Sequence, residues 1–330
     1  MPENEKKKRK LPRFVIPLLV LAGILGGGAL WQMWMLSADS PVYDAPGYVV
    51  HDLPLDYASP STLKPDKNAY IHVYTTGTAG AVSVLMLSDW DTVAPALDYA
   101  PIIRLVAPRA RVIVVERPGH GWSGAKYSER TVDNMVNDTL FALNAVAEAG
   151  PFVIVADGTS GLEAIHMASK YPEMVSGIMF INAPPPAVYV YNPSMLLDIL
   201  KAHTYFVPRV TGIFRAVNAF KPAFFEPGPG VDPDWYRALY FRNAMSSGMR
   251  AEIRALVGNA KDTLVEAAYL NLPCAAFVYN ADYEKNPEVT RVWDDFNASV
   301  GAVASISSLG SNLQQLASGE IAQSILSLVK

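Results

Sequence analysis

Apolar residues are grouped along this chain in runs separated by polar, glycine-rich and proline-rich stretches, and the first run is the longest. It covers Phe14–Leu36 (FVIPLLVLAGILGGGALWQMWML) and contains no charged residue. A helix over its 23 residues would be about 35 Å long, enough to cross a hydrocarbon core of about 30 Å. We therefore predict a transmembrane anchor at residues 14–36.

The residues on either side of this run predict its orientation. A basic block (EKKKRKLPR) closes the segment 1–13, which we expect to stay in the cytoplasm, while Trp31 and Trp34 lie at the far end, where aromatic side chains favour the interface. A cleaved signal peptide is the alternative, but the run is longer than a usual signal peptide and LSAD is a poor cleavage site. We expect a single-pass protein of the cell membrane with its main domain outside the cytoplasm.

Residues 37–68 show no hydrophobic period and are rich in Pro, Asp, Ser and Tyr, which is typical of a linker leading into a domain. From Ala69 onward, short apolar blocks alternate with segments of helical period. These blocks predict strands in AYIHVYT, VSVLML, RVIVV, FVIVA and SGIMFI, with helices at about 93–106, 131–148 and 162–170. Such alternation predicts an α/β fold with a doubly wound, mostly parallel sheet.

The pattern changes after Pro186, where aromatic and proline-rich helical pieces continue to about Leu270. Two further strands (PCAAFVYNAD and AVASISSL) and a closing helix (SGEIAQSILSLVK) follow. We therefore assign residues 69–185 and 272–330 to one core and residues 186–271 to a helical cap, inserted over the carboxyl edge of the sheet.

Composition supports a folded domain and excludes several classes of function. The chain has 330 residues, 51% of them hydrophobic and 18% charged, which is ample material for a core. A net charge of −4 indicates no basic surface for nucleic acid. The single cysteine, Cys274, excludes an intrachain disulfide, and no H-x-x-x-H or H-E-x-x-H pair is present, so we expect no metal and no cofactor.

One stretch raises the question of chemistry. FVIVADGTSGLEAIHMASKYP, residues 152–172, is an apolar run, then a cluster of small residues, then a helical segment. This is the pattern of a buried strand that turns sharply into a helix, and such turns usually present a nucleophile. At the apex of this turn the chain has Gly158.

Several motifs in order carry a resemblance to a known family. ERPGHGWSG resembles the D-x-P-G-x-G-x-S loop of α/β-hydrolases, YPEMVSGIMFINAPP resembles the helix and strand after their nucleophile turn, and LMLSDW the strand that normally ends in His-Gly. From about Ala69 to the C-terminus the chain is thus similar to α/β-hydrolases of the esterase, epoxide hydrolase and proline iminopeptidase type. The resemblance implies that fold, with a serine, histidine and acid as catalytic triad.

The positions that the resemblance assigns to the triad are degenerate. The nucleophile position is Gly158, and the histidine position is Ser311, in the pair Gly310-Ser311. The last histidine of the chain is His203, so nothing after it could act as that base. The acid position is Asp282, after FVYNA.

The resemblance also assigns the oxyanion loop. The family's His-Gly lead reads Ser88-Asp89 here, and Thr159 follows the apex. A carboxylate at Asp89 would oppose catalysis, because negative charge must develop there.

Relocated catalytic groups are the alternative. Ser160, two residues past the apex, is the best remaining nucleophile, with His120 or His166 as its base, although a small residue at position 160 also serves strand and helix packing. Ser123 follows a different strand and loop, and the flanking residues of Asp157 disfavour it sterically. Cap residues form either a ligand pocket or the packing of the cap itself: His203, Tyr205, Phe206, Trp235 and Tyr236.

The expected function is that of a membrane-anchored, catalytically inactive relative of these hydrolases. It would act by binding a small apolar ligand or a membrane-protein partner. The alternative is an active serine hydrolase of ester, amide or peptide bonds that uses Ser160. Glycine at the apex would remove the backbone strain that any residue with a Cβ suffers there.

Overall fold

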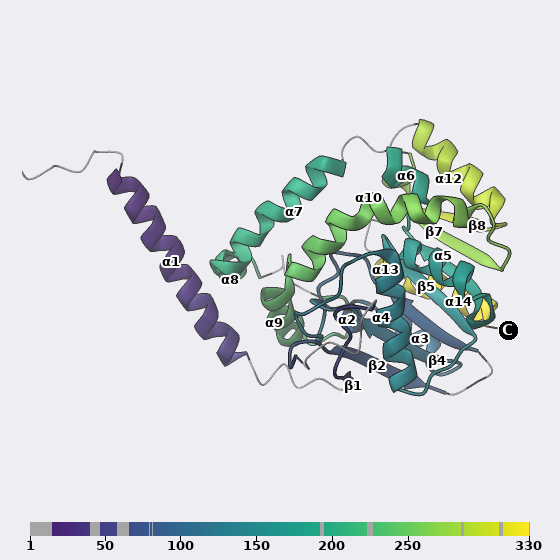
Figure 1. Cartoon of the computed structure of the whole chain (residues 1–330), viewed down its shortest axis with the longest axis horizontal. Coiled ribbons are helices and arrows are strands. Elements are labelled where there is room, and N and C mark those ends of the chain that lie inside the picture. Colours follow the sequence, from purple (N-terminus) through teal and green to yellow (C-terminus); the bar gives the residue numbers. More distant parts are fainter. Residues whose placement is uncertain are drawn as a thin grey trace, which may run out of the picture.

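The structure is a computed structural model that describes residues 15–39, 47–57, 66–78, 80, 82–191, 195–222, 227–284, 287–309 and 313–329. Figure 1 shows a long N-terminal helix beside a layer of cap helices, with an α/β core on the other side of the cap. The predicted positions Gly310 and Ser311 lie outside the described residues.

The core contains an eight-stranded sheet in the order β1-β2-β4-β3-β5-β6-β7-β8. Strands β3 to β8 are parallel, whereas β2 pairs antiparallel with both β1 and β4. The predicted doubly wound, mostly parallel sheet is therefore confirmed. The strands are β1 Tyr48–Val50, β2 Ile71–Gly77, β3 Ser83–Leu87, β4 Arg111–Glu116, β5 Phe152–Asp157, β6 Val175–Ile181, β7 Cys274–Tyr279 and β8 Val303–Ser307.

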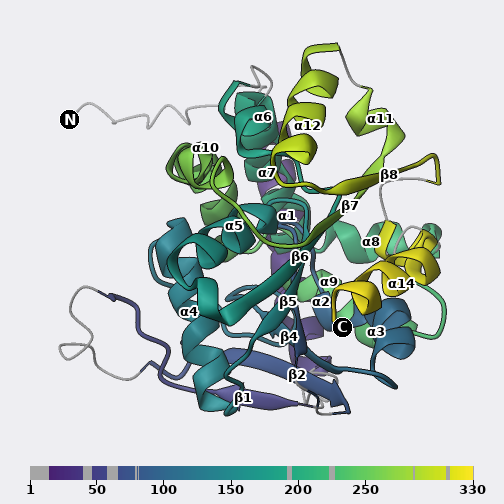
Figure 2. The same cartoon turned by 90° about the vertical axis from the view of Figure 1, so that its right-hand side faces the viewer.

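Helices cover both faces of this sheet (Figure 2). The helices of the core are α2 Pro95–Asp98, α3 Ala100–Val106, α4 Val132–Ala145, α5 Ser160–Lys170, the 3₁₀ helix Pro172–Met174, α11 Asn280–Tyr283, α12 Pro287–Ser299, α13 Leu313–Leu316 and α14 Ser318–Leu328. Alternate residues of the inner strands enter one of two cores: Leu85 belongs to the core with α4, α5 and α12, whereas Val84 belongs to the core with α3 and α14.

The segment between β6 and β7 is helical and lies over the core, as Figure 1 shows. Its longest helix begins at a capping serine, because Ser246 Oγ accepts from the Met249 N–H at 3.2 Å. The helices of this segment are α6 Pro186–Tyr191, α7 Met195–Val210, α8 Ile213–Phe220, α9 Pro233–Asn243 and α10 Ser247–Ala267.

Two features of the chain's N-terminal third differ from the simplest interpretation of the sequence. The lead-in at residues 37–68 contributes the edge strand β1, which pairs with β2. The strands β2 and β3, although consecutive, are separated in the sheet by β4.

The N-terminal helix α1 covers Val15–Ala38 and is long and apolar enough to cross a membrane.

Candidate functional site

The turn between β5 and α5 has the conformation that the sequence predicts. Gly158 has φ +55°, in the left-handed region that residues with a Cβ rarely adopt. Its N–H donates to the Ile181 carbonyl of the neighbouring strand β6 at 3.0 Å. Gly161 is also constrained, since a Cβ there would lie 3.0 Å from the Ala183 Cβ. Small residues thus let strand and helix approach closely.

The Asp89 carboxylate fills the space in front of this turn. An ideal Cβ on Gly158 would lie 2.2 Å from Asp89 Cγ, and 2.4 and 2.5 Å from its two oxygens. Asp89 Oδ1 accepts from the Thr159 N–H at 2.8 Å, the Thr159 hydroxyl at 2.7 Å and the Trp90 N–H at 2.8 Å. A side chain at position 158 would have to displace a carboxylate that three donors hold.

These two N–H groups are the ones that would form an oxyanion hole. In α/β-hydrolases the hole consists of the N–H after the nucleophile and an N–H from the loop after the third strand. Thr159 follows the apex, and Trp90 lies in the loop after β3. Here both donors bind an oxygen of the chain's own Asp89. The motif spacing predicted a carboxylate at Asp89, but it did not predict the hydrogen bonds that this carboxylate accepts from the two N–H groups.

Two further buried acidic groups are Asp157, the last residue of β5, and Asp98, the last residue of α2. Burial, followed by the charge of Asp89, holds the pKa of Asp157 well above its usual range. Burial also raises the pKa of Asp98 to about 7, although a backbone hydrogen bond with Ala94 opposes this shift. The Tyr99 hydroxyl donates to the Leu87 carbonyl at 2.8 Å. The environment therefore favours neutral carboxyl groups at Asp98 and Asp157.

The structure does not bring Ser160 together with a histidine. Ser160 is fully buried, and its Oγ lies 2.9 Å from the Leu87 carbonyl oxygen and 2.8 Å from that of Asp157. His120 Nδ1 faces the Thr92 carbonyl at 2.8 Å, and His166 lies between Glu266 and Asp133. The three side chains therefore have different hydrogen-bond partners, and neither histidine is hydrogen-bonded to Ser160.

A buried charge cluster joins the cap to the core, and no pattern in the sequence indicates it. Glu252 of α10 lies 3.2 Å from Arg117 Nη2, 3.5 Å from Arg130 Nη2 and 3.5 Å from His120 Nε2. Arg117 also pairs with Glu163 of α5 and donates to the Ser88 carbonyl at 2.6 Å. Burial would raise the pKa of Glu252, but Arg117, His120 and Arg130 outweigh it and lower this pKa to about 2. The cluster connects α10, through Glu252, and the end of β3, through Ser88, to the same arginine.

The cap residues from the predicted pocket mostly pack against the protein. Trp235 meets Trp122 edge-on, with ring centroids 5.7 Å apart, and Tyr236 is hydrogen-bonded to Asp98. Phe206 lies under Arg250, and His203 Nε2 is 3.2 Å from an Arg254 nitrogen. Tyr205, in contrast, is exposed.

The acid position Asp282 lies in α11, directly after β7. Its side chain lies outside the described set, so its relation to the turn remains a prediction. Among the residues that the structure describes, no group of three or more His, Cys, Asp or Glu could hold a metal ion.

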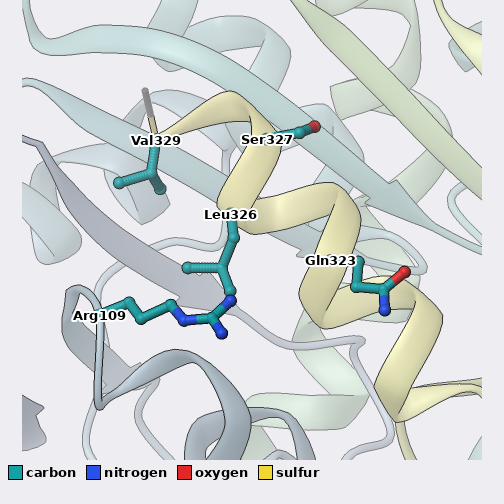
Figure 3. A pocket seen from close by; sticks show the side chains of 5 residues that line it. All are labelled: Arg109, Gln323, Leu326, Ser327 and Val329. Carbon is teal, nitrogen blue, oxygen red and sulfur yellow. The ribbon is translucent and has the colours of Figure 1, made fainter.

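One hollow lies at the opposite edge of the sheet from the turn. It has a volume of about 420 Å³ and is lined by Arg109, before β4, and by residues of and just after α14: Gln323, Leu326, Ser327 and Val329 (Figure 3). Arg109 precedes the amino end of a parallel strand, whereas α/β folds bind ligands at the carboxyl ends. This hollow is therefore separate from the candidate site.

Sequence comparisons give two partial relatives and no family model that matches. The chain is 24% identical over 187 residues to YbdG of Bacillus subtilis (strain 168), covering 56% of this chain and 57% of YbdG. It is 35% identical over 78 residues to C23C11.06c of Schizosaccharomyces pombe, covering 24% of this chain and 15% of that protein. The chain thus spans little more than half of the first relative and a small part of the second.

Comparison with solved structures is more informative. A loop variant of the haloalkane dehalogenase DbeA from Bradyrhizobium elkanii has a TM-score of 0.58 at 17% identity, covering 78% of this chain and 93% of that chain. The enol-lactonase from Burkholderia xenovorans LB400 has a TM-score of 0.56 at 14% identity, and the match covers 78% of this chain and 96% of that chain. AqDC, which cleaves the ring of the Pseudomonas quinolone signal, has a TM-score of 0.55 at 18% identity, and the match covers 81% of this chain and 98% of that chain.

These likenesses, together with the sheet order and the sharp turn after β5, define the fold of the protein. The chain has the α/β-hydrolase fold, with a helical segment inserted after β6. The resemblance carried by the motifs at residues 85–90, 116–124 and 171–185 is confirmed for the fold.

Proposed function

We propose that this protein is a membrane-anchored α/β-hydrolase-like protein that binds a ligand or partner and does not hydrolyse it. The observation that carries the proposal is the Asp89 carboxylate, which accepts from the N–H groups of Thr159 and Trp90 beside an apex residue without a side chain. A serine hydrolase needs the reverse arrangement, with a nucleophile at the apex and empty donors beside it.

The electrostatics of the site support the same conclusion. A tetrahedral intermediate carries a negative oxygen, which two N–H donors stabilise when they are available. Here that oxygen would have to replace Asp89 Oδ1 and then lie close to its negative charge. Asp157 and Asp98 would add further repulsion if they ionised, and their pKa values are raised, first by burial and then by neighbouring carboxylates.

Membrane anchoring rests on α1 and its flanking residues. The helix is apolar over Val15–Ala38, and most of its apolar side chains are exposed, as a lipid-facing helix requires. The basic residues before it favour a cytoplasmic N-terminus. We propose a single-pass protein of the cell membrane, with the α/β core on the extracytoplasmic side and its ligand a small apolar molecule or a membrane-protein partner.

A fluorophosphonate probe, which labels activated serines, tests the absence of hydrolase chemistry. Full-length protein in detergent would be treated beside its Ser160→Ala variant and a known serine hydrolase, then analysed by intact mass and peptide mapping. We expect the hydrolase alone to be labelled. Stoichiometric labelling of one serine in this chain, lost in the Ser160→Ala variant, would establish the alternative of an active enzyme with a relocated nucleophile.

A further inference from the structure

The C-terminal half of α1 packs against the corner between α7 and α8. An ideal Cβ on Gly28 would lie 2.4 Å from the Thr211 carbonyl oxygen, and one on Gly212 would lie 2.9 Å from the Trp31 ring. Glycines on both sides of the contact let the two backbones approach closely. Figure 1 shows α8 directly beside α1.

Buried polar groups fix the height of this contact along α1. Gln32 Nε2 donates to the Phe241 carbonyl at 2.9 Å, and Arg215 Nε donates to Gln32 Oε1 at 2.7 Å. Arg215 also pairs with Asp39 and lies 4.5 Å from the centroid of the Phe241 ring. A shift of the cap along α1 would leave these buried groups without partners.

The length of α1 then sets the depth of the cap. From Val15 to Gly27 the helix has 13 residues (15 to 27), or about 20 Å, which is less than the roughly 30 Å of a hydrocarbon core. A span that starts at Val15 must therefore reach about Trp34. Gly28, which touches the α7–α8 corner, would lie about 9 Å below that boundary. Tilting α1 would bring still more of the helix into the hydrocarbon.

The outer faces of α7 and α8 suit this depth. Each presents two exposed apolar side chains seven residues apart, and therefore on one face of the helix. They are Leu200 and Val207, 53% and 42% exposed, and Ile213 and Phe220, 41% and 87% exposed. Residues 195–222 contain four basic side chains and one acidic one, so lipid phosphates would not repel this segment.

The orientation of these helices also fits a membrane surface. In Figure 1 α7 runs crosswise to α1, and α8 is seen nearly end-on while α1 lies across the view. Both helices thus lie across the direction along which α1 would cross the bilayer. The inner side of α7 is covered by α10, through Phe206 on Arg250. Interfacial helices have this arrangement, with their apolar face about 5–10 Å deep.

We propose that the outer faces of α7 and α8 rest in the headgroup and upper acyl region of the leaflet from which α1 emerges. The cap is then a second membrane contact, and the bilayer is its partner. This inference rests on the proposed function, because it requires α1 to span the membrane.

The test uses full-length protein in phosphatidylcholine nanodiscs and an environment-sensitive fluorophore on single cysteines. The buried Cys274 is replaced by Ala, and cysteines are placed at Ile213, Phe220, Leu21 of α1 and Tyr269. Tyr269, 81% exposed after α10, is the matched control for an exposed aromatic site. Lipids with a nitroxide high on the acyl chain and aqueous iodide act as opposing quenchers.

We expect the lipid nitroxide to quench labels at Ile213 and Phe220 as strongly as the label at Leu21, and at least about twofold more strongly than the label at Tyr269. We also expect the labels at Ile213 and Phe220 to be shielded from iodide. If both behave like Tyr269 while Leu21 is quenched, the anchor holds but the cap contact is wrong. If Leu21 also escapes the nitroxide, α1 does not span, and the proposed anchoring fails together with this inference.

Discussion

Gly158 combines a left-handed backbone with a space that the Asp89 carboxylate already fills. We predict that Gly158→Ser lowers the free energy of unfolding by about 1–3 kcal/mol from backbone strain alone, with a further loss from displacing Asp89. Denaturant unfolding of the full-length protein in detergent measures this effect.

Gly258 supplies the matched control. It lies inside α10, and a Cβ there would meet nothing within 4 Å. We expect Gly258→Ala to stabilise the protein by roughly 0.5–1 kcal/mol, because alanine favours a helix over glycine. A Gly158→Ser variant as stable as the parent protein would contradict the predicted strain.

The contact between positions 89 and 158 predicts that their substitutions are coupled. Asp89→Ala leaves the Thr159 N–H and hydroxyl without this acceptor, while the Trp90 N–H keeps Thr159 Oγ1 at 3.1 Å. It should cost about 1–3 kcal/mol. It also opens the space that a serine side chain at position 158 needs. The loss caused by Gly158→Ser should therefore be smaller, by about 1 kcal/mol or more, in the Asp89→Ala background. Strictly additive losses in a double-mutant cycle would argue against the contact.

Asp98 gives the protein a defined dependence on pH. Burial raises its pKa in the folded state to about 7, against a usual value near 3.8. Between these values the folded state retains a proton that the unfolded state has lost, so stability falls as pH rises from about 4 to 7. We expect Asp98→Asn to flatten this decline, because the amide remains neutral. Unfolding curves of both proteins across this pH range test the point, and parallel curves would contradict it.

At the scale of elements, α10 depends on Glu252, the one acidic group that faces Arg117, Arg130 and His120 together among the described ion pairs. Glu252→Gln keeps the volume but removes the charge that these three side chains share. Arg117 keeps its pair with Glu163 and Arg130 its pair with Asp138, so we predict a loss of about 1–3 kcal/mol. Exposed Asp262 on the same helix is the control, and Asp262→Asn should change stability by less than about 0.5 kcal/mol. Equal effects of the two substitutions on thermal unfolding would contradict the predicted contribution of the cluster to stability.

The lowered pKa of Glu252 gives the sign of its own pH effect. Burial opposes ionisation, but Arg117, His120 and Arg130 lower this pKa to about 2. Its contribution is therefore complete above the usual glutamate pKa of 4.5 and is lost as pH falls toward 2. This decline is opposite in direction to that of Asp98, and it disappears in Glu252→Gln.

Periodicity was sufficient to predict most elements but not the contacts between distant ones. The runs that became β3, β4, β5 and β6 are β-branched or apolar and end at turn residues, so local pattern located them. The strand β1 has only three residues, too few to show alternation. The placement of β4 between β2 and β3 depends on pairing across the sheet, which no local pattern encodes.

The candidate site divides in the same way. The apex glycine followed from motif spacing, because a strand, small residues and a helix are contiguous in the chain. The bonds of Asp89 depend on the approach of two segments 70 residues apart. Glu252 is separated from Arg117 by more than 100 residues, and only the packing of α10 on the core reveals that they meet.

At the scale of the whole molecule, α1 and the cap form one connected unit through Gly28. A larger residue there would collide with the Thr211 carbonyl, whereas Gly27, one residue earlier, has nothing within 4 Å. We predict that Gly28→Leu separates α1 from the α7–α8 corner and speeds hydrogen exchange in α8 about tenfold, which corresponds to a contact of about 1.4 kcal/mol. Gly27→Leu should leave that exchange unchanged. Exchange measured by mass spectrometry in nanodiscs distinguishes the two variants. The same rate in both would mean that the cap holds its position without α1, and then the proposed depth of the cap would not follow from the length of α1.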